Sequence, residues 1–391
     1  MFESRGHRLW FLPAFVFVLV LLSACASKSN LPPPTPLAEL RSKLDVDRVW
    51  LRVNIAERQR ASQGQGIYAD ESVFLWVDKR GKLHANHAQS GKSLWVVDVG
   101  APISSRPGVK DELIYVVTQN AELVALNKKS GEEQWRSNVS SEALVAPVVA
   151  EGIVIVYCVD GSVFGLNVAD GGERWRYHTK VPVISLRGNA TPVVANGRVI
   201  VGLSDGRLAA LDLWSGKEKW LVSLAKPRGR TELERMVDVD TTPVVMDGIV
   251  YTAAYQGQVV ALQLRSGRVL WSFDISTAKD IAVSDEHIYL VDEESVLYAL
   301  GRKNGRVLWK QDALAWRYAT APTLYNGYLV VGDLDGYLHW LDSQNGRLVH
   351  RVWTDFHDFD TKPVVADDKL YAMSRAGIID VLQLRKVVVQ D

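Results

Sequence analysis

Cysteine is almost absent from this chain, which has only Cys25 and Cys158 among its 391 residues. Because Cys25 lies close to the N-terminus, the folded part retains Cys158 alone, has no internal disulfide and depends on its hydrophobic core. An excess of charge is also missing, since 45 Lys and Arg residues balance 45 Asp and Glu residues, so nothing indicates a nucleic-acid partner. The apolar run at the N-terminus, Leu9 to Leu22, falls short of the roughly 20 residues that a membrane-spanning helix needs.

That apolar run has the features of an export signal. Arg5 and Arg8 precede it, and a basic start before a short apolar stretch is typical of secretory signals. The run ends in Leu-Ser-Ala-Cys (22–25), which resembles the lipobox of bacterial lipoproteins, in which the cysteine thiol is acylated; an ordinary cleavage site with a chance cysteine is the alternative. We expect a lipoprotein signal peptide over residues 1–24 and acylation of Cys25 with palmitate. Because Ala26 rather than Asp follows, the resemblance implies sorting to the outer membrane in bacteria with two membranes.

A tether is expected over residues 25–44. Its Ser- and Pro-rich part, residues 27–36, cannot bury apolar area and is typical of an extended linker. Leu37 to Leu44 has the spacing of one or two amphipathic helical turns. We expect one folded domain over residues 45–386 and a C-terminal tail over residues 387–391.

An internal repeat determines the predicted fold. A phrase of the form Ala-Leu-Asp-x-x-Ser-Gly-x-x-x-Trp recurs about every 40 residues, with its glycines at 91, 131, 171, 216, 267, 305 and 346. Upstream of each copy lie three short segments rich in Val, Ile and Tyr, separated by turn residues such as Met246-Asp247-Gly248 and Gln256-Gly257. Four antiparallel strands per repeat of this length are typical of a propeller blade.

Eight such repeats are present when the segment Pro363 to Leu384 is included. This last repeat lacks its fourth strand, and the segment from Val49 to Val53 near the N-terminus matches it. We therefore predict an all-β, eight-bladed β-propeller of four-stranded antiparallel blades, closed by an N-terminal strand, which removes two sheet edges. A seven-bladed ring with one divergent repeat is the alternative.

The tryptophans of the repeat are predicted to pack between blades rather than to bind a ligand. A large ring at one fixed position suits a wedge between neighbouring blades, and its indole N–H needs one backbone partner. His350 replaces the tryptophan in the seventh repeat, and we expect this to affect packing only. Seven of the 13 tryptophans occupy the position: Trp50, Trp95, Trp135, Trp175, Trp220, Trp271 and Trp309.

No catalytic constellation accompanies the repeats. The eight histidines show no zinc-binding spacing, and the pair Asp238 and Asp240 lacks the accompanying groups that metal binding or acid–base catalysis would need. The repeat resembles the tryptophan-docking repeat of quinoprotein dehydrogenases, eight-bladed enzymes that hold pyrroloquinoline quinone and a calcium ion. Those enzymes typically have adjacent cysteines and long insertions, which this chain lacks. We expect no metal, no cofactor and no enzymatic activity, with a quinoprotein-like dehydrogenase as the alternative.

Two consecutive connections between blades are unusually long. Only 12 residues separate Trp95 from Pro107, but 17 separate Trp175 from Pro192 and 23 separate Trp220 from Pro243. Extra loop length on a rigid scaffold is where function usually concentrates, although tolerated insertions would look the same. Apolar residues beside Arg and acidic residues in these loops suit a protein contact.

Two stretches in these loops resemble segments of the BamB family, the propeller lipoproteins of the β-barrel assembly machinery. They are Ser-Leu-Arg-Gly (185–188) and Asp-Val-Asp-Thr-Thr-Pro-Val-Val (238–245), and the likeness extends over essentially the whole chain. It implies a non-catalytic scaffold, lipid-anchored on the periplasmic face of the outer membrane, that binds the POTRA domains of the central barrel subunit and assists the folding and insertion of outer-membrane proteins. The family's partner-binding positions match Leu186, Arg187, Asp238 and Asp240, and Ile184 stands where the family often has Leu.

Each implied contact residue has a predicted role. Leu186 would be the desolvated anchor of the interface. Arg187 would pair either with a carboxylate of the partner or with Asp238 or Asp240. Exposed blade edges would in addition accept a strand from unfolded substrate proteins.

Overall fold

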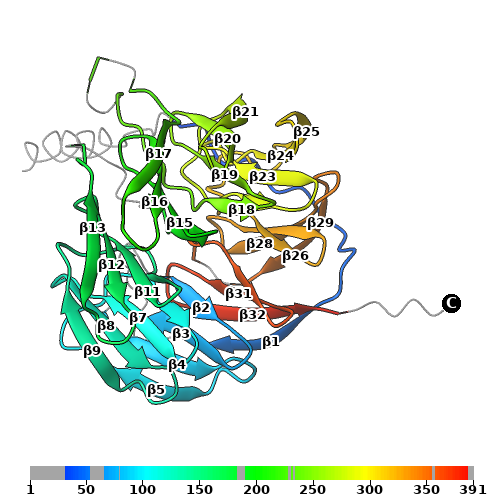
Figure 1. Ribbon diagram of the computed structural model, residues 1–391. Helices are drawn as coiled ribbons and strands as arrows, with labels where there is room; N and C mark the ends of the chain where they lie inside the picture. Colours follow the sequence, from blue (N-terminus) through cyan, green and yellow to red (C-terminus); the bar gives the residue numbers. More distant parts are fainter. Residues whose placement is uncertain are drawn as a thin grey trace, which may run out of the picture. The chain divides into compact units, whose positions relative to one another are not determined.

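We describe residues 31–52, 66–78, 80–182, 190–227, 230–231, 234–354 and 357–385 of a computed structural model. The chain divides into two compact units, 1–34 and 35–391, and the fold concerns the second. Its regular elements within these ranges are all β-strands, grouped in eight four-stranded sheets. The sheets form a ring of blades, so the eight-bladed β-propeller is confirmed and the seven-bladed alternative is wrong (Figure 1).

In blades 1 to 7 the strands run antiparallel in chain order, from the innermost strand to the outermost. Blades 1 to 4 comprise β2 (Ile67–Ala69), β3 (Val73–Val77), β4 (Leu83–His87) and β5 (Ser93–Val97); β6 (Gly108–Lys110), β7 (Leu113–Val117), β8 (Glu122–Asn127) and β9 (Glu133–Asn138); β10 (Val148–Ala150), β11 (Ile153–Tyr157), β12 (Ser162–Asn167) and β13 (Glu173–His178); and β14 (Val193–Ala195), β15 (Arg198–Gly202), β16 (Arg207–Asp212) and β17 (Glu218–Ser223). Blades 5 to 7 comprise β18 (Val244–Met246), β19 (Ile249–Ala253), β20 (Gln258–Gln263) and β21 (Val269–Asp274); β22 (Ala282–Val283), β23 (His287–Val291), β24 (Leu297–Gly301) and β25 (Val307–Gln311); and β26 (Thr323–Tyr325), β27 (Tyr328–Gly332), β28 (Tyr337–Asp342) and β29 (Leu348–Trp353).

Blade 8 joins the two ends of the propeller, as predicted. It consists of β30 (Val364–Ala366), β31 (Lys369–Met373), β32 (Ile379–Leu384) and, on its outer edge, β1 (Val46–Arg52). β1 runs antiparallel to β32 (Figure 1). Arg48 donates to both carboxylate oxygens of Asp380, Nε to Oδ1 at 2.9 Å and Nη2 to Oδ2 at 2.8 Å. Because Asp380 is buried, this two-pronged ion pair joins the closing strand firmly to the last one.

The core is divided among the eight contacts between neighbouring blades. Each of eight separate hydrophobic clusters takes its side chains from two adjacent blades. The second and third strands of a blade are buried on both faces, so they read as continuous apolar runs such as Ile153–Tyr157. The core therefore holds the ring together through contacts between blades.

The predicted role of the tryptophans is confirmed. Each ring lies against the glycine of the recurring phrase in the following blade, and each indole N–H donates to a backbone carbonyl oxygen beside that glycine. Seven of the eight contacts between neighbouring blades thus have the same pair of interactions, and the contact from blade 7 to blade 8 is the exception. The seven bonds, 2.9–3.2 Å long, run from Trp50 to Ala88, Trp95 to Lys128, Trp135 to Val168, Trp175 to Leu213, Trp220 to Leu264, Trp271 to Arg302 and Trp309 to Ser343.

Blade 7 lacks the tryptophan for a topological reason. Blade 8 takes its outer strand from the other end of the chain, so no turn joins its third strand to its fourth and no turn glycine is available there. Instead the segment before β1 covers β29: Ser42 Oγ lies 2.5 Å from His350 Nδ1, and the N–H of Lys43 donates to the carbonyl oxygen of Val349 (2.9 Å). Residues 37–44 contain no helical residue, so the amphipathic helical turn predicted there is wrong.

The two turns predicted in blade 5 lie where expected, but a positive φ of the glycine explains the need for glycine in only the first of them. Asp247 and Gly248 both have positive φ (53° and 73°), as a two-residue hairpin of type I′ requires. In the second turn Gln256 has the positive φ (50°). A Cβ atom at Gly257 would lie 2.9 Å from the Ala225 Cβ, so close packing against the preceding connection requires that glycine.

Candidate functional site

The blades present two different faces because their strands alternate in direction. One face, which we call the connection face, carries the turns between second and third strands and the connections that lead to the next blade. The opposite hairpin face carries the turns between first and second strands and between third and fourth strands. The two longest connections, from β13 to β14 and from β17 to β18, both lie on the connection face and serve consecutive blades. The predicted partner-binding residues therefore belong to one region of one face.

Three of the predicted residues fall outside the described ranges. Ile184, Leu186 and Arg187 lie in residues 183–189, and the predicted lipid-bearing Cys25 lies in residues 1–30. Asp238 and Asp240 are described, and both lie in the last part of the second connection.

That last part is fixed to the propeller. Val237 and Val239 are buried in the cluster between blades 4 and 5. The N–H of Tyr255 donates to the carbonyl oxygen of Asp238 at 2.8 Å. A Cβ atom at Gly202 would overlap the carbonyl oxygen of Val239, so a glycine at the end of β15 allows the segment to approach this closely. The two aspartates consequently stand on a rigid support.

Asp238 and Asp240 alternate with the buried valines, so their side chains leave the segment on the other side. Asp238 is buried, and Asp240 is half-buried with both carboxylate oxygens shielded from solvent. Neither Asp240 oxygen has a hydrogen-bond partner within the described ranges. Burial, together with the negative charges of Asp238 and Asp280, raises the pKa of Asp240 well above its ordinary value. A cationic group brought to this place would therefore gain a strong electrostatic partner.

A buried tyrosine hydroxyl also lies near the pair. The hydroxyl of Tyr157, in blade 3, lies close enough that burial first, and then the charges of Asp238 and Asp240, raise its pKa. Tyr157 belongs to the cluster between blades 3 and 4, and the first long connection starts from blade 3. The acidic pair thus faces the blades from which both long connections emerge.

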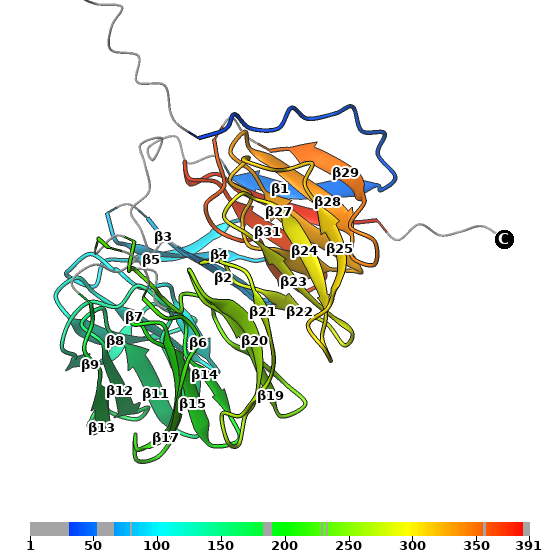
Figure 2. The same cartoon turned by 90° about the horizontal axis from the view of Figure 1, so that it is seen from above.

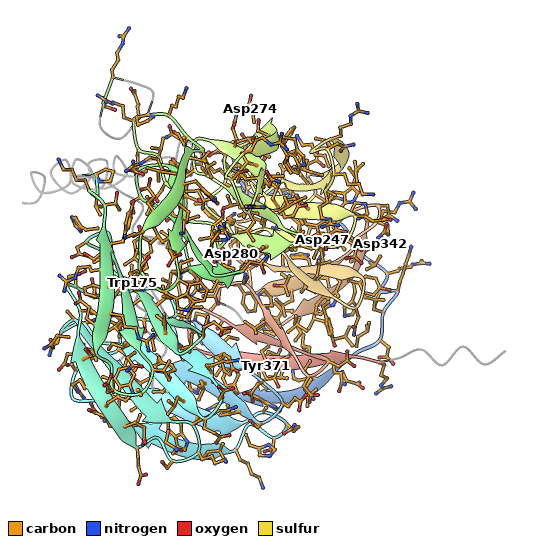
Figure 3. The ribbon with its side chains drawn as sticks, in the orientation of Figure 1. Trp175, Asp247, Asp274, Asp280, Asp342 and Tyr371 are labelled. Carbon is orange, nitrogen blue, oxygen red and sulfur yellow. The ribbon has the colours of Figure 1, made fainter. Side chains whose placement is uncertain are left out.

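A charged group that sequence reasoning missed lies next to the pair. Asp280, which is labelled in Figure 3, accepts the N–H of Thr242 on Oδ1 (2.7 Å) and a hydrogen bond from Lys362 Nζ on Oδ2 (2.6 Å). Burial alone would raise the pKa of Asp280, but Lys362, the Thr242 N–H and Arg106 together lower it below its ordinary value. Asp280 is accordingly ionised, and its charge is matched by Lys362.

The missed residues share one repeat position. Arg106, Asp280 and Lys362 each stand two residues before the innermost strand of blades 2, 6 and 8. Ala146, Thr191, Thr242 and Ala321 occupy the same place in blades 3, 4, 5 and 7. Aligning the repeats at this position would have revealed the charges, because innermost strands lie nearest the axis of the ring.

The described residues outline neither a metal centre nor a reactive thiol. Across the described ranges, no three His, Cys, Asp or Glu residues are placed to hold a metal ion. Cys158 is fully buried, and burial raises its pKa to about 11, so it remains an unreactive thiol. The described part of the chain also has no helix that is long and apolar enough to cross a membrane.

Comparison with known proteins identifies close relatives. The model of the family described as outer membrane protein assembly factor BamB matches residues 79–311. The BamB protein of Yersinia pestis is 36% identical over 376 residues, which cover 92% of this chain and 95% of the relative. The crystal structure of BamB from Moraxella catarrhalis is 27% identical, with a TM-score of 0.78, and covers 87% of this chain and 100% of that one.

Quinoprotein enzymes share the architecture at lower identity. Quinohemoprotein alcohol dehydrogenase from Comamonas testosteroni has a TM-score of 0.69 but 12% identity, covering 93% of this chain and 82% of that one. Such a likeness concerns the fold alone, because one fold supports many functions.

Proposed function

The chain belongs to the BamB family of outer membrane protein assembly factors, and from this premise we propose that it is a non-catalytic scaffold that docks on the central barrel subunit of the assembly machinery. The docking surface comprises the two long connections of the connection face, and the partner region is the periplasmic POTRA domains. The observation that carries this proposal is the acidic pair Asp238 and Asp240, held rigidly between blades 4 and 5 with the Asp240 carboxylate shielded from water. A scaffold of this kind assists barrel folding by holding the machinery together and performs no reaction.

Leu186 and Arg187 complete the proposed surface from the first connection. Leu186, with Ile184 beside it, supplies the apolar centre that a protein interface needs. Arg187 supplies a planar cation that can pair with a carboxylate through two hydrogen bonds. The carboxylate that pairs with Arg187 belongs either to the partner or to Asp240. Burial raises the pKa of Asp240 and disfavours its charged form, and a neighbouring cation would favour that form.

A pull-down tests the docking proposal. The immobilised periplasmic region of the barrel subunit is incubated with wild-type protein, with Leu186→Ala plus Arg187→Ala, and with Lys129→Ala. Lys129 is exposed in a turn on the hairpin face, so it serves as the matched control. We expect the double variant to lose binding at unchanged thermal stability and the control to bind like wild type. Equal binding by all three proteins would contradict the proposal.

A double-mutant cycle distinguishes the two roles of Arg187. The variants are Arg187→Ala, Asp240→Asn and their combination, each measured for free energy of unfolding and for partner affinity. If Arg187 pairs with Asp240, the two substitutions are coupled in the unfolding of the isolated protein. If Arg187 pairs with the partner, the two substitutions are additive in unfolding and in affinity, and Arg187→Ala alone weakens binding.

We further propose that a lipid on Cys25 anchors the protein at the periplasmic face of the outer membrane. Several acyl chains together hold a protein firmly, because each buried methylene contributes about 0.8 kcal/mol. Wild-type protein should incorporate labelled palmitate and sediment with outer membranes. Cys25→Ser should do neither, and palmitate incorporation by that variant would refute the assignment.

A further inference from the structure

Blades 5, 6 and 7 share a motif that the proposed function leaves unexplained. The turn into the outermost strand reads Gly-Arg followed by two apolar residues: Gly267 to Leu270, Gly305 to Leu308 and Gly346 to Val349. In blades 2, 3 and 4 the two corresponding positions are polar or charged, from Glu133-Gln134 to Glu218-Lys219. Outermost strands are edge strands of their sheets, and an apolar pair on such an edge normally invites another chain.

On blade 7 that other chain is part of the protein itself. The segment Thr35–Leu44, which we call the strap, starts at the connection between blades 6 and 7, where the Thr35 N–H donates to the carbonyl oxygen of Ala315 (3.0 Å). It then runs past β29 (Figure 2). The Arg351 side chain donates to the carbonyl oxygen of Ala38 (3.2 Å), and the N–H of Lys43 donates to the carbonyl oxygen of Val349 (2.9 Å).

Leucines of the strap pack in the same clusters as the apolar pair. Leu37 packs against the cluster that includes Leu348, and Leu44 packs against the cluster that includes Val349. Val349 is only 7% exposed in this cluster. An extended segment with spaced leucines thus lies along the outer edge of blade 7.

The equivalent residues on blades 5 and 6 are uncovered. Leu270 and Leu308, at the repeat position of Val349, are 43% and 52% exposed, and their neighbours Val269 and Val307 are 46% and 44% exposed. Two consecutive blades thus present the surface that the strap covers on the third. The exposed Arg268 and Arg306 stand directly before these pairs and offer donors to the carbonyl oxygens of a passing chain.

We propose that the outer edges of β21 and β25 bind extended segments of unfolded outer-membrane proteins, in the manner in which the strap lies on β29. The choice of occupant rests on the proposed function, because an assembly factor meets chains whose membrane strands alternate apolar and polar residues. Such a segment places its apolar side chains on the Val-Leu pair and its backbone groups against the edge. This site lies on the outer edges of blades 5 and 6, whereas the proposed docking surface lies on the connection face.

Peptide binding by the full chain tests this site. The probe is a fluorescein-labelled synthetic peptide of about ten residues, the length of a membrane β-strand, in which Leu and Val alternate with Ser and Thr. A peptide of the same composition with its apolar residues in one block serves as the probe control. The variants are Leu270→Asp plus Leu308→Asp, and Leu94→Asp as the matched protein control. Leu94 stands at the same repeat position in blade 1 and is 52% exposed, but Ser93 replaces the second apolar residue.

Anisotropy titrations should show that the double variant binds the alternating peptide at least about tenfold more weakly than wild type. Leu94→Asp should bind it like wild type, and the blocked peptide should bind none of the proteins well. Equal affinity in all three proteins, or an equal loss in Leu94→Asp, would overturn the proposal. Concentration-dependent dimers of wild type that the double variant does not form would also overturn it, because the occupant would then be a second copy.

The barrel-subunit pull-down separates this inference from the docking proposal. The variant Leu270→Asp plus Leu308→Asp should retain binding to the barrel subunit, whereas Leu186→Ala plus Arg187→Ala should retain the alternating peptide. If the docking proposal fails, peptide binding at the edges of β21 and β25 can still be tested, and if the peptide proposal fails, docking on the barrel subunit can still be tested.

Discussion

The contact between Trp220 and Gly267 predicts that two glycines with the same backbone conformation differ in their tolerance of alanine. Gly267 (φ 70°) and Gly248 (φ 73°) both lie in turns of blade 5. Alanine at either position lowers the free energy of unfolding by about 1–2 kcal/mol, because it must adopt the left-handed conformation. A Cβ atom at Gly248 would meet nothing within 4 Å, whereas at Gly267 it would lie 2.8–3.0 Å from three atoms of the Trp220 ring.

The extra cost at Gly267 follows from that overlap. Ordinary carbon contacts are about 3.5–4.0 Å long, so the ring must shift, and overpacking of this kind costs about 1–3 kcal/mol. A shifted ring also weakens the Trp220 N–H bond to the Leu264 carbonyl, which contributes about 1 kcal/mol. We expect Gly267→Ala to destabilise the protein by about 3–5 kcal/mol and Gly248→Ala by about 1–2 kcal/mol.

Urea unfolding followed by circular dichroism measures the difference. The two variants should have the same slope and different midpoints, as expected when only stability changes. Equal midpoints would refute the reasoning, because the interlock of tryptophan and glycine between blades would then contribute nothing beyond the backbone conformation.

Three further predictions concern ring closure, the acidic pair and the strap. Arg48→Ala should lower the free energy of unfolding by about 3 kcal/mol, because it leaves Asp380 buried without its cation. The control Arg385→Ala removes an exposed ion pair with Asp47 and should cost under about 1 kcal/mol. Equal losses of the two variants in denaturant titrations would contradict the closure argument. Asp240 has a raised pKa in the folded protein, so the folded state binds its proton more tightly, and stability falls as the pH rises from about 4 through that raised pKa. Asp240→Asn should therefore raise the melting temperature more at about pH 8 than at about pH 4. A change in melting temperature that does not depend on pH would contradict this prediction. His350→Trp should destabilise by about 1–3 kcal/mol through collision with the strap at Ser42, and a gain in melting temperature would show that the repeat's tryptophan fits there after all.

The fold was predictable because every blade repeats the same physical solution. Glycines and tryptophans recur about every 40 residues since each tryptophan must meet the glycine of the next blade. The segment around Trp50 could be assigned to blade 8 for the same reason. Departures from the repeat were harder to interpret: His350 makes sense only once blade 8 is seen to lack the turn that would receive a tryptophan.

Local pattern failed where tertiary contacts decide the conformation. Leu37 to Leu44 has helical spacing, but Leu37 packs at the contact between blades 6 and 7 and Leu44 at the contact between blades 7 and 8, and no residue of the segment is helical. At Gly257 the glycine is required by a neighbouring connection rather than by its own φ. Neither cause can be deduced from the ten residues around each position, because both are contacts with parts of the chain that are distant in sequence.

The candidate site was predictable only in part. Asp238 and Asp240 could be singled out from loop length and resemblance, and they do lie together on one rigid segment. Their proximity to Asp280 and Lys362 could not be foreseen, because these residues come from blades 6 and 8 and meet the pair only through closure of the ring. The sequence did indicate the additional charges, because Asp280 and Lys362 occupy the same position of the repeat, two residues before the innermost strand.

Site-specific photocrosslinking in cells tests the central claim most directly. A photoreactive residue replaces either Arg235, exposed in the second long connection, or Lys129, exposed on the hairpin face. If the connection face docks on the assembly machinery, position 235 crosslinks to the central barrel subunit and position 129 does not. Crosslinks to that subunit from position 129 alone, or from neither position, would contradict the account.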